Sequence, residues 1–232
     1  MAARSETAAI EAASGAVDSL GESRWPPAIA LITFIGLNTA LRIWLPHNGA
    51  FRVPWLVPTV ETVLLIVLVL SDPGNLAKHH RTLRRVSVTL VCLLVLAALW
   101  ETILLVYDLV RGTGVTTSAP RLLASGAVIW IGNNLAFALL YWLSDGGGPV
   151  ARSRLEVPVD FAFTQHMSPE LAPPGWRPVF LDYLHLGFTN ATAFSPTDVM
   201  PLSHRAKYMM IVQSTVALAL FGLIVARAVN AF

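Results

Sequence analysis

Five long apolar segments constrain the fold of this 232-residue chain more than any other feature. Each approaches or exceeds the roughly 20 residues that a helix needs to cross a bilayer, and proline, glycine or charged residues lie at their boundaries. Charged residues make up 13% of the chain, against about a quarter in a soluble domain. These features indicate an integral, multi-pass protein of a plasma (inner) membrane. The segments are residues 28–45, 55–70, 86–110, 122–143 and 206–231.

A sixth apolar segment, residues 179–193, is too short and too polar at its end to span a membrane. A segment of this length is typical of a re-entrant or buried half-helix. The predicted fold is therefore an all-α bundle of five transmembrane helices with one re-entrant half-helix before the last span. We divide the chain into a mobile tail (1–26), a four-helix membrane region (27–145), a polar linker (146–178) and a terminal unit (179–232). The linker sequence Ser168-Pro169-Glu170 predicts the start of a short helix.

The lysines and arginines predict an orientation in the membrane. If the N-terminus is inside, eleven of them lie on the inner side and four on the outer side, so the positive-inside rule favours this arrangement. The eleven inner residues are Arg4, Arg24, Lys78, Arg81, Arg84, Arg85, Arg152, Arg154, Arg177, Arg205 and Lys207. Tyr141 and Trp142 lie near the end of the fourth segment, where membrane proteins form aromatic belts.

The stretch from Phe180 to Val229 resembles the pore helix, filter loop and inner helix of tetrameric potassium channels. The resemblance rests on Thr192-Ala193 at the end of the half-helix, on Asp198-Val199-Met200-Pro201 after the loop, and on Arg205 before the last helix. The chain is also similar to bacterial membrane families of unknown function that have four spans, a half-helix and a terminal span. That second likeness rests on the runs Tyr141–Pro149 and Ser168–Pro174.

The filter itself departs from the channel pattern. Phe194, Ser195, Pro196 and Thr197 stand where a potassium channel has Val-Gly-Tyr-Gly. Glycines allow the backbone angles that turn every carbonyl toward the pore axis, whereas proline fixes its own φ and restricts the residue before it. A dehydrating potassium filter is therefore disfavoured. A wider hydrated passage remains, and a ring of Asp198 carboxylates would favour cations in it.

The same tetrapeptide also has a structural interpretation. Ser195-Pro196-Thr197-Asp198 matches a helix start, with serine at the N-cap, proline at N1 and an acid at N3. The side of the membrane adds a second disagreement. Pore loops of potassium channels enter from outside, whereas the basic residues place this half-helix on the inner side.

Polar residues within the apolar segments are candidate functional sites, because they are costly at membrane depth. They could form a polar seam that conducts or relays, or they could serve as hydrogen bonds between helices. On the half-helix, the three-residue spacing of Asp182 and His185 puts both on one helical face, with no third ligand to complete a metal site. The candidates in the spans are Asn38, Glu61, Glu101, Asn133 and Asn134.

The sequence lacks a phosphate-binding loop, the common hydrolase and metalloprotease motifs, and a basic nucleic-acid-binding patch. We therefore expect neither an enzyme nor a cofactor, metal or nucleic-acid partner. The leading hypothesis is a potassium-channel-like, homotetrameric pore in the lipid bilayer that passes monovalent cations non-selectively or weakly. One alternative is a non-conducting structural or interaction protein, and another is a small proton-linked transporter that uses Glu61 and Glu101.

Overall fold

A computed structural model describes residues 25–44, 80–111, 119–153, 157–192 and 198–229, together with Thr59, Thr62, Val63 and Ile66. The protein is mostly helical. The long helices are α2 (Trp25–Trp44), α4 (His80–Arg111), α5 (Ala119–Ser144) and α9 (His204–Val229), and a shorter helix, α8 (Phe180–Thr192), precedes α9. The remaining elements are η3 (Asp145–Gly147), α6 (Pro149–Ser153), β1 (Phe161–Phe163), α7 (Thr164–Met167), η4 (Pro169–Leu171) and β2 (Val199–Pro201).

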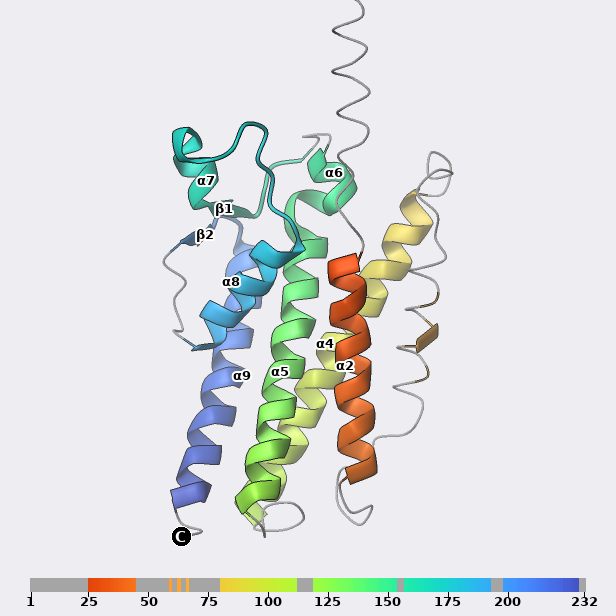
Figure 1. Ribbon diagram of the computed structural model, residues 1–232, viewed down its shortest axis with the longest axis vertical. Coiled ribbons are helices and arrows are strands. Elements are labelled where there is room, and N and C mark those ends of the chain that lie inside the picture. The colour runs from red at the N-terminus through yellow and green to blue at the C-terminus, as the bar shows by residue number, and fades with distance from the viewer. Residues whose placement is uncertain are drawn as a thin grey trace, which may run out of the picture.

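The four long helices lie side by side along the long axis of the molecule (Figure 1). Three of the described helices, α4, α5 and α9, contain stretches long and apolar enough to cross a membrane, and α2 is a shorter apolar helix by the same measure. They match the predicted segments 28–45, 86–110, 122–143 and 206–231 to within a few residues, except that α4 begins six residues earlier. The predicted span 55–70 lies largely outside the described residues.

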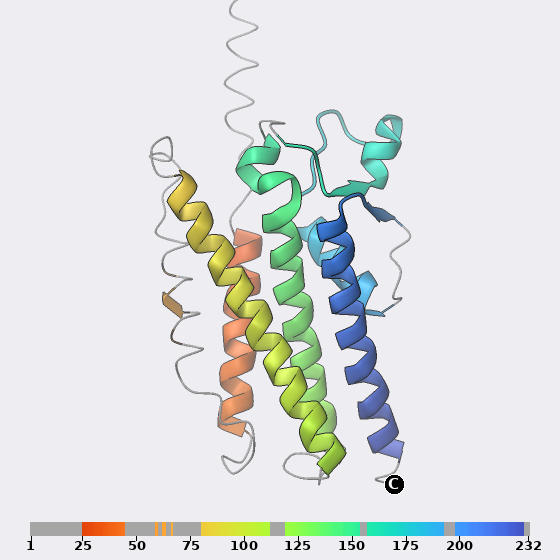
Figure 2. The ribbon, with the colours of Figure 1, turned by 180° about the vertical axis from the view of Figure 1, so that it is seen from behind.

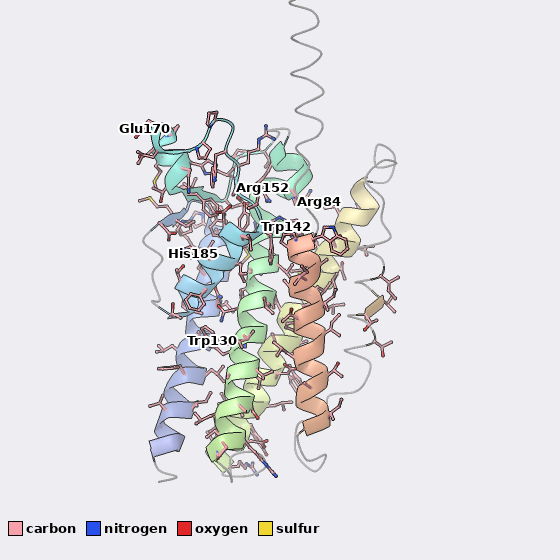
Figure 3. All side chains as sticks on the ribbon, in the orientation of Figure 1. Arg84, Trp130, Trp142, Arg152, Glu170 and His185 are labelled. Carbon is pink, nitrogen blue, oxygen red and sulfur yellow. The ribbon has the colours of Figure 1, made fainter. Side chains whose placement is uncertain are left out.

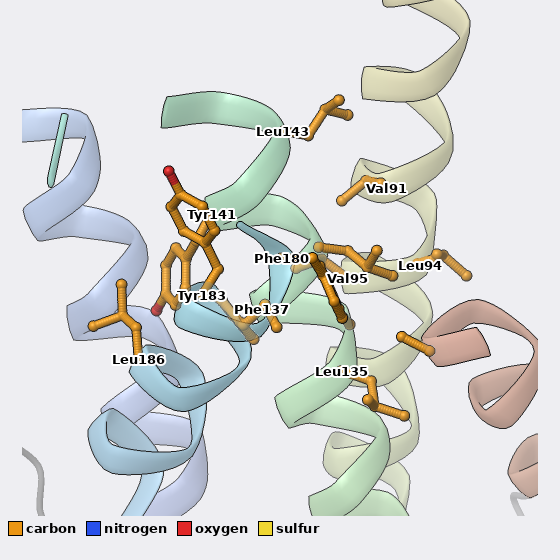
Figure 4. Close-up of a cluster of buried hydrophobic side chains, with 14 of the residues drawn as sticks. Val91, Leu94, Val95, Leu135, Phe137, Tyr141, Leu143, Phe180, Tyr183 and Leu186 are labelled. Atoms are coloured by element: carbon orange, nitrogen blue, oxygen red, sulfur yellow. The ribbon is translucent and has the colours of Figure 1, made fainter. Parts of the chain in front are cut away.

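Helix α5 is the centre of the bundle and contacts α2, α4, α8 and α9. In Figure 2, α4 lies in front of α2 and runs at an angle to α5. The main core lies where α4, α5 and α8 meet (Figure 4), and its labelled members include Leu94 from α4, Phe137 from α5 and Phe180 and Leu186 from α8, all buried. Because α5 is surrounded, its residues 132–139 are all buried.

A folded cap covers the end of the bundle where α5 ends and where α2, α4 and α9 begin (Figure 1). We use "cap" for the described residues between α5 and α8 together with β2. Within it, β1 and β2 pair antiparallel, with Phe161 opposite Pro201 and Phe163 opposite Val199. The prediction of an all-α chain is therefore wrong at this point, because Phe161–Phe163, within the predicted polar linker, form a strand that pairs with β2.

The short helix predicted at Ser168 is present as the 3₁₀ turn η4, with Pro169 at its first position and Glu170 in its first turn. Ser168 makes no side-chain capping hydrogen bond there. The predicted half-helix 179–193 is α8, which begins beside the cap and descends alongside α5 and α9 (Figure 1). The chain is again at the cap end in β2, before α9 begins.

Candidate functional site: a half-helix held by two buried polar networks

Helix α8 has one buried and one exposed face. Tyr183, Leu186 and Asn190 are among the buried residues and recur every three to four positions. That spacing puts them on one side of a helix, against α5 and α9. His185 and Phe188 lie on the other side and are exposed. Two networks of buried polar groups hold the inner face of this half-helix.

The first network is centred on Asp145, whose side chain is fully buried at the end of α5. The Tyr183 hydroxyl donates to Oδ2 of Asp145 at 2.5 Å. The backbone N–H groups of Asp160 and Phe161 donate to Oδ1 at 2.6 and 3.2 Å. One carboxylate therefore joins α8, β1 and the end of α5. A buried carboxylate with several donors is the arrangement that compensates for its loss of water.

Two arginines donate hydrogen bonds to backbone carbonyl groups at the end of α5. Arg152 is buried, and its Nη1 donates to the carbonyls of Trp142 (2.6 Å) and Asp145 (2.8 Å). Arg205, in the first turn of α9, donates to the Ser144 carbonyl at 3.0 Å and pairs with Asp160 at 2.5 Å. Carbonyls at a helix C-terminus lack intrahelical donors and carry partial negative charge, so cations are favoured there.

Gly146 allows the chain to turn at this crowded place. Its φ of +54° lies in the left-handed region, and a Cβ at this position would lie 2.7 Å from Cγ of Arg152. Its N–H donates to Oδ2 of Asp160 at 3.3 Å. Any other residue would bring both backbone strain and a clash. The glycine run after Asp145 thus permits the close packing of Arg152 over the end of α5, where its guanidinium also lies 5.0 Å from the Tyr183 ring centre.

The second network lies deeper, around Gln213 of α9, which is almost completely buried. Its Oε1 accepts from the Tyr141 hydroxyl at 2.6 Å and from Nδ2 of Asn190 at 2.8 Å. Its Nε2 donates to the Gly187 carbonyl at 2.9 Å. The Ser214 hydroxyl donates to Oδ1 of Asn190 at 3.0 Å. These bonds join α5, α8 and α9 within the apolar core.

The exposed face of α8 carries a histidine that contacts an aspartate. Nε2 of His185 lies 3.1 Å from Oδ2 of Asp198, and both side chains are substantially exposed. The Asp198 carbonyl accepts from the N–H and the hydroxyl of Thr164, at 3.1 and 2.9 Å. At the far end of α8, the Thr192 hydroxyl donates to the Phe188 carbonyl at 2.8 Å. Thus Asp198 is fixed at the base of the loop, and Thr192 is exposed at the end of the half-helix.

Another acid of this region, Asp182, lies in the first turn of α8. Partial burial raises the pKa of its carboxyl above the ordinary value, and the Val179 N–H and the nearby His185 oppose this rise less strongly. The Val179 N–H donates to Oδ2 of Asp182 at 2.7 Å. Asp182 therefore caps the start of α8, while His185 turns to Asp198.

The structure brings together only part of the predicted site. Thr192, Asp198, Asp182 and His185 belong to one unit, whereas the filter-like residues Ala193, Phe194, Ser195, Pro196 and Thr197 lie outside the described residues. So does Glu61. The alternative helix start at Ser195 therefore stays a prediction.

The other intramembrane candidates lie elsewhere, in contacts between long helices. The Asn38 amide, with its nitrogen toward Glu101, donates to both carboxylate oxygens of that residue at 2.8 Å. Asn133 donates to the Thr102 hydroxyl at 2.8 Å and Asn134 to the Trp130 carbonyl at 2.9 Å. The Asn38 bonds join α2 to α4 and the Asn133 bond joins α5 to α4, whereas the Asn134 bond lies within α5. The first two fit the interpretation of interhelical hydrogen bonding, and all three are separate from the α8 networks.

Several residues of the two polar networks are not among the predicted site residues. Gln213 interrupts the last apolar span, and a polar residue at that depth is itself a signal of a functional or packing role. Tyr141 was expected in an aromatic belt, which is wrong, because its side chain is fully buried and bonded to Gln213. Asp145 is the last residue of the predicted membrane region 27–145 and Asp160 lies in the predicted linker 146–178, and neither is among the predicted site residues.

Within the described ranges, three or more histidine, cysteine, aspartate or glutamate side chains do not gather into a metal-binding group. A scan of protein families, a search of curated proteins and a search of solved structures each found no match for this chain. Any functional conclusion therefore depends on the geometry of α8 and its partners.

Proposed function

We propose that this protein is a pore-forming membrane protein with the frame of a potassium channel and a filter that passes cations with little selectivity or low conductance. In this proposal the bundle has five spans. Helix α8 enters the membrane from the cap side, and the chain is back on the cap side at β2. The observation that carries the proposal is the half-helix itself, held by buried polar bonds between two long apolar helices.

The length of α8 supports a re-entrant rather than a spanning helix. Its thirteen residues rise about 20 Å at about 1.5 Å per residue, short of the roughly 30 Å of a hydrocarbon core. Non-helical backbone at membrane depth is tolerated where it is covered by protein or lines a water-filled cavity. A re-entrant segment needs such a setting, and a pore supplies it.

The polarity of this region favours cations. The C-terminal end of α8 points away from the cap and lies beside α9 at the edge of the bundle (Figure 1), and the C-terminus of a helix carries partial negative charge. Thr192 is exposed at this end, and Asp198 follows the loop. Half-helix ends and acidic side chains are recurring cation sites in membrane proteins. The replaced filter glycines argue for a hydrated passage rather than a dehydrating one.

The proposed assembly is a homotetramer in the plasma (inner) membrane. One half-helix per chain cannot enclose an axis, whereas four related copies can. The described basic residues Arg84, Arg85, Arg152, Arg205 and Lys207 belong to the cap or to the cap-side ends of α4 and α9. The positive-inside rule therefore puts the cap in the cytoplasm, and α8 enters from the opposite side to a potassium-channel pore helix.

A second candidate function is a non-conducting structural or interaction protein. The specific observation in its favour is that Asp198 has two partners. The Asp198 carboxylate contacts His185, and the Asp198 backbone carbonyl accepts a hydrogen bond from Thr164. A carboxylate held in this way would stabilise the position of α8 against the cap rather than attract ions. The proton-linked alternative now concerns Glu101, whose carboxylate receives the Asn38 amide.

Ion flux in liposomes separates these functions. Purified protein should release a trapped monovalent cation, and Asp198→Asn should lower the rate several-fold, because one charge is lost from each chain. Glu170→Gln is the matched control, since Glu170 is an exposed acid on η4 and its loss should leave the flux unchanged. The absence of flux at every voltage would favour the non-conducting function. Proton-coupled uptake that Glu101→Gln abolishes and Asp198→Asn leaves intact would favour the transporter.

A further inference from the structure

An apolar groove runs between α5 and the exposed face of α8. It has a volume of about 460 Å³ and is open at the surface. In Figure 3, the labelled side chains Trp130 and His185 mark its two helices. Trp130 and Phe188 pack edge to face, with ring centres 5.7 Å apart. The lining residues are Trp130, Ile131, Asn134, Leu135, Leu181, Leu184, His185 and Phe188.

The surface that the groove offers is apolar. Asn134 is a polar lining residue, but its amide nitrogen donates to the Trp130 carbonyl and its oxygen is covered by protein. His185 turns toward Asp198. Leu181 and Phe188 are about half exposed, and Ile131 is 38% exposed. An occupant therefore gains from burying hydrocarbon and has little to gain from a polar group.

The size of the lining side chains argues against a packed helix as the occupant. Helices associate in membranes through small residues, which let two backbones approach closely. Tryptophan, phenylalanine, leucine and isoleucine dominate this groove and keep a neighbouring backbone at a distance. A flexible acyl chain can instead follow an irregular groove between large side chains.

From the lining, the openness to the outer surface and the position beside two long apolar helices, we infer that this groove holds an acyl chain of a membrane phospholipid. The inference rests on the membrane placement proposed above and holds whether or not the protein conducts. The bound acyl chain would pack against the exposed face of α8, while the two polar networks hold the inner face of α8.

Photo-crosslinking in vesicles tests this assignment. The full chain is reconstituted in phosphatidylcholine and phosphatidylglycerol vesicles with a trace of phosphatidylcholine that carries a diazirine on one acyl chain, and labelled peptides are located by mass spectrometry. We expect labelling of Leu184 and Phe188 several-fold above that of Leu96 and Trp100, which are exposed on α4. Ile131→Trp, which fills the groove, should remove this excess. Leu96→Trp is the matched control on α4 and should preserve it.

Each remaining outcome overturns the inference in a distinguishable way. Equal labelling of the groove and of α4 would show ordinary lipid contact and leave the membrane placement standing. Absence of labelling on both faces, in vesicles that contain the protein, would contradict both proposals. Disulfide-linked dimers formed through Phe188→Cys, in a Cys92→Ser background, would assign the groove to a second copy of the chain. Circular dichroism of each variant establishes that it is folded.

Discussion

The Tyr183 hydroxyl donates a hydrogen bond to the buried carboxylate of Asp145, and this bond fixes the half-helix to the end of the central helix. The same carboxylate accepts two backbone N–H groups at the start of β1. The cap and the half-helix therefore share one buried anchor. Loss of the anchor should weaken both, even though neither residue belongs to the proposed pore.

Tyr183→Phe tests this anchor with little change in shape. It removes the donor and leaves Oδ2 of Asp145 buried without it, which should lower the free energy of unfolding by about 1 to 3 kcal/mol. Thermal unfolding in detergent should show a clear decrease in Tm. Tyr208→Phe on α9 is the control, because Tyr208 is 67% exposed and its substitution should leave Tm unchanged. Equal Tm values for wild type and Tyr183→Phe would refute the anchoring role.

Gln213→Leu should release the inner end of α8. The variant keeps the size of the side chain but removes partners of Tyr141, Asn190 and the Gly187 carbonyl. Interhelical hydrogen bonds in membrane proteins contribute about 0.6 kcal/mol on average, so we expect a loss of about 1 to 2 kcal/mol for the three together. Proteolysis of the folded protein should become faster at the loop after α8.

The control for this substitution is Thr215→Val on the same helix. Thr215 is exposed, and its hydroxyl bonds only to the Ile211 carbonyl of its own helix among the described contacts. Its substitution should leave proteolysis unchanged. A protease-resistant Gln213→Leu variant would show that apolar packing alone holds α8 in place.

Gly187 of α8 lies close to the central helix α5. A Cβ there would lie 3.4 Å from the Asn134 carbonyl oxygen and 3.7 Å from Cβ of Ala138. Gly187→Leu should therefore overpack the contact and destabilise the fold by about 1 to 3 kcal/mol. Gly222→Leu is the matched control, since nothing lies within 4 Å of a Cβ at Gly222. Similar chemical-denaturation midpoints for the two variants would contradict the close packing.

Most of the long helices could be predicted from the sequence, because their boundaries follow hydrophobicity and helix breakers. The start of α8 near Phe180 and the start of α9 near His204 are examples. The cap could not be predicted in the same way. The pairing of β1 with β2 joins residues almost 40 positions apart, and strands of three residues carry little periodicity.

The polar networks show a second limit of sequence reasoning. The predicted half-helix 179–193 contains Asn190, but the partners of Asn190, Tyr141 and Gln213, lie 49 and 23 positions away. Hydrophobic pattern places a residue in a helix, yet it does not say which helix faces which. The Asp145–Tyr183 bond depends equally on the way in which α8 packs against the end of α5.

Asp182 predicts a pH dependence of stability. Burial raises the pKa of its carboxyl in the folded protein above the ordinary 3.8, so the folded chain binds this proton more tightly than the unfolded chain. Its contribution to stability is then lost as the pH rises from about 4 through the folded pKa. Asp182→Asn lacks this proton, so wild type should lose Tm relative to the variant as the pH rises from about 4 through the folded pKa.

The comparison is made as a difference, because other acids titrate in the same range. A wild type that gains stability relative to Asp182→Asn as the pH rises would contradict the direction given by burial.

The measurement that tests the central claim most directly is the sidedness of residues before and after α8. Single cysteines at Glu170, Leu202 and Arg121, in a Cys92→Ser background, are labelled with a membrane-impermeant maleimide in intact cells and in inverted vesicles. Glu170 precedes α8, Leu202 follows β2, and Arg121 lies near the opposite end of α5. A re-entrant α8 predicts labelling of Glu170→Cys and Leu202→Cys from the same side, in inverted vesicles, and of Arg121→Cys from the other side. Labelling of Glu170→Cys and Leu202→Cys from opposite sides would show that α8 crosses the membrane and would contradict the account.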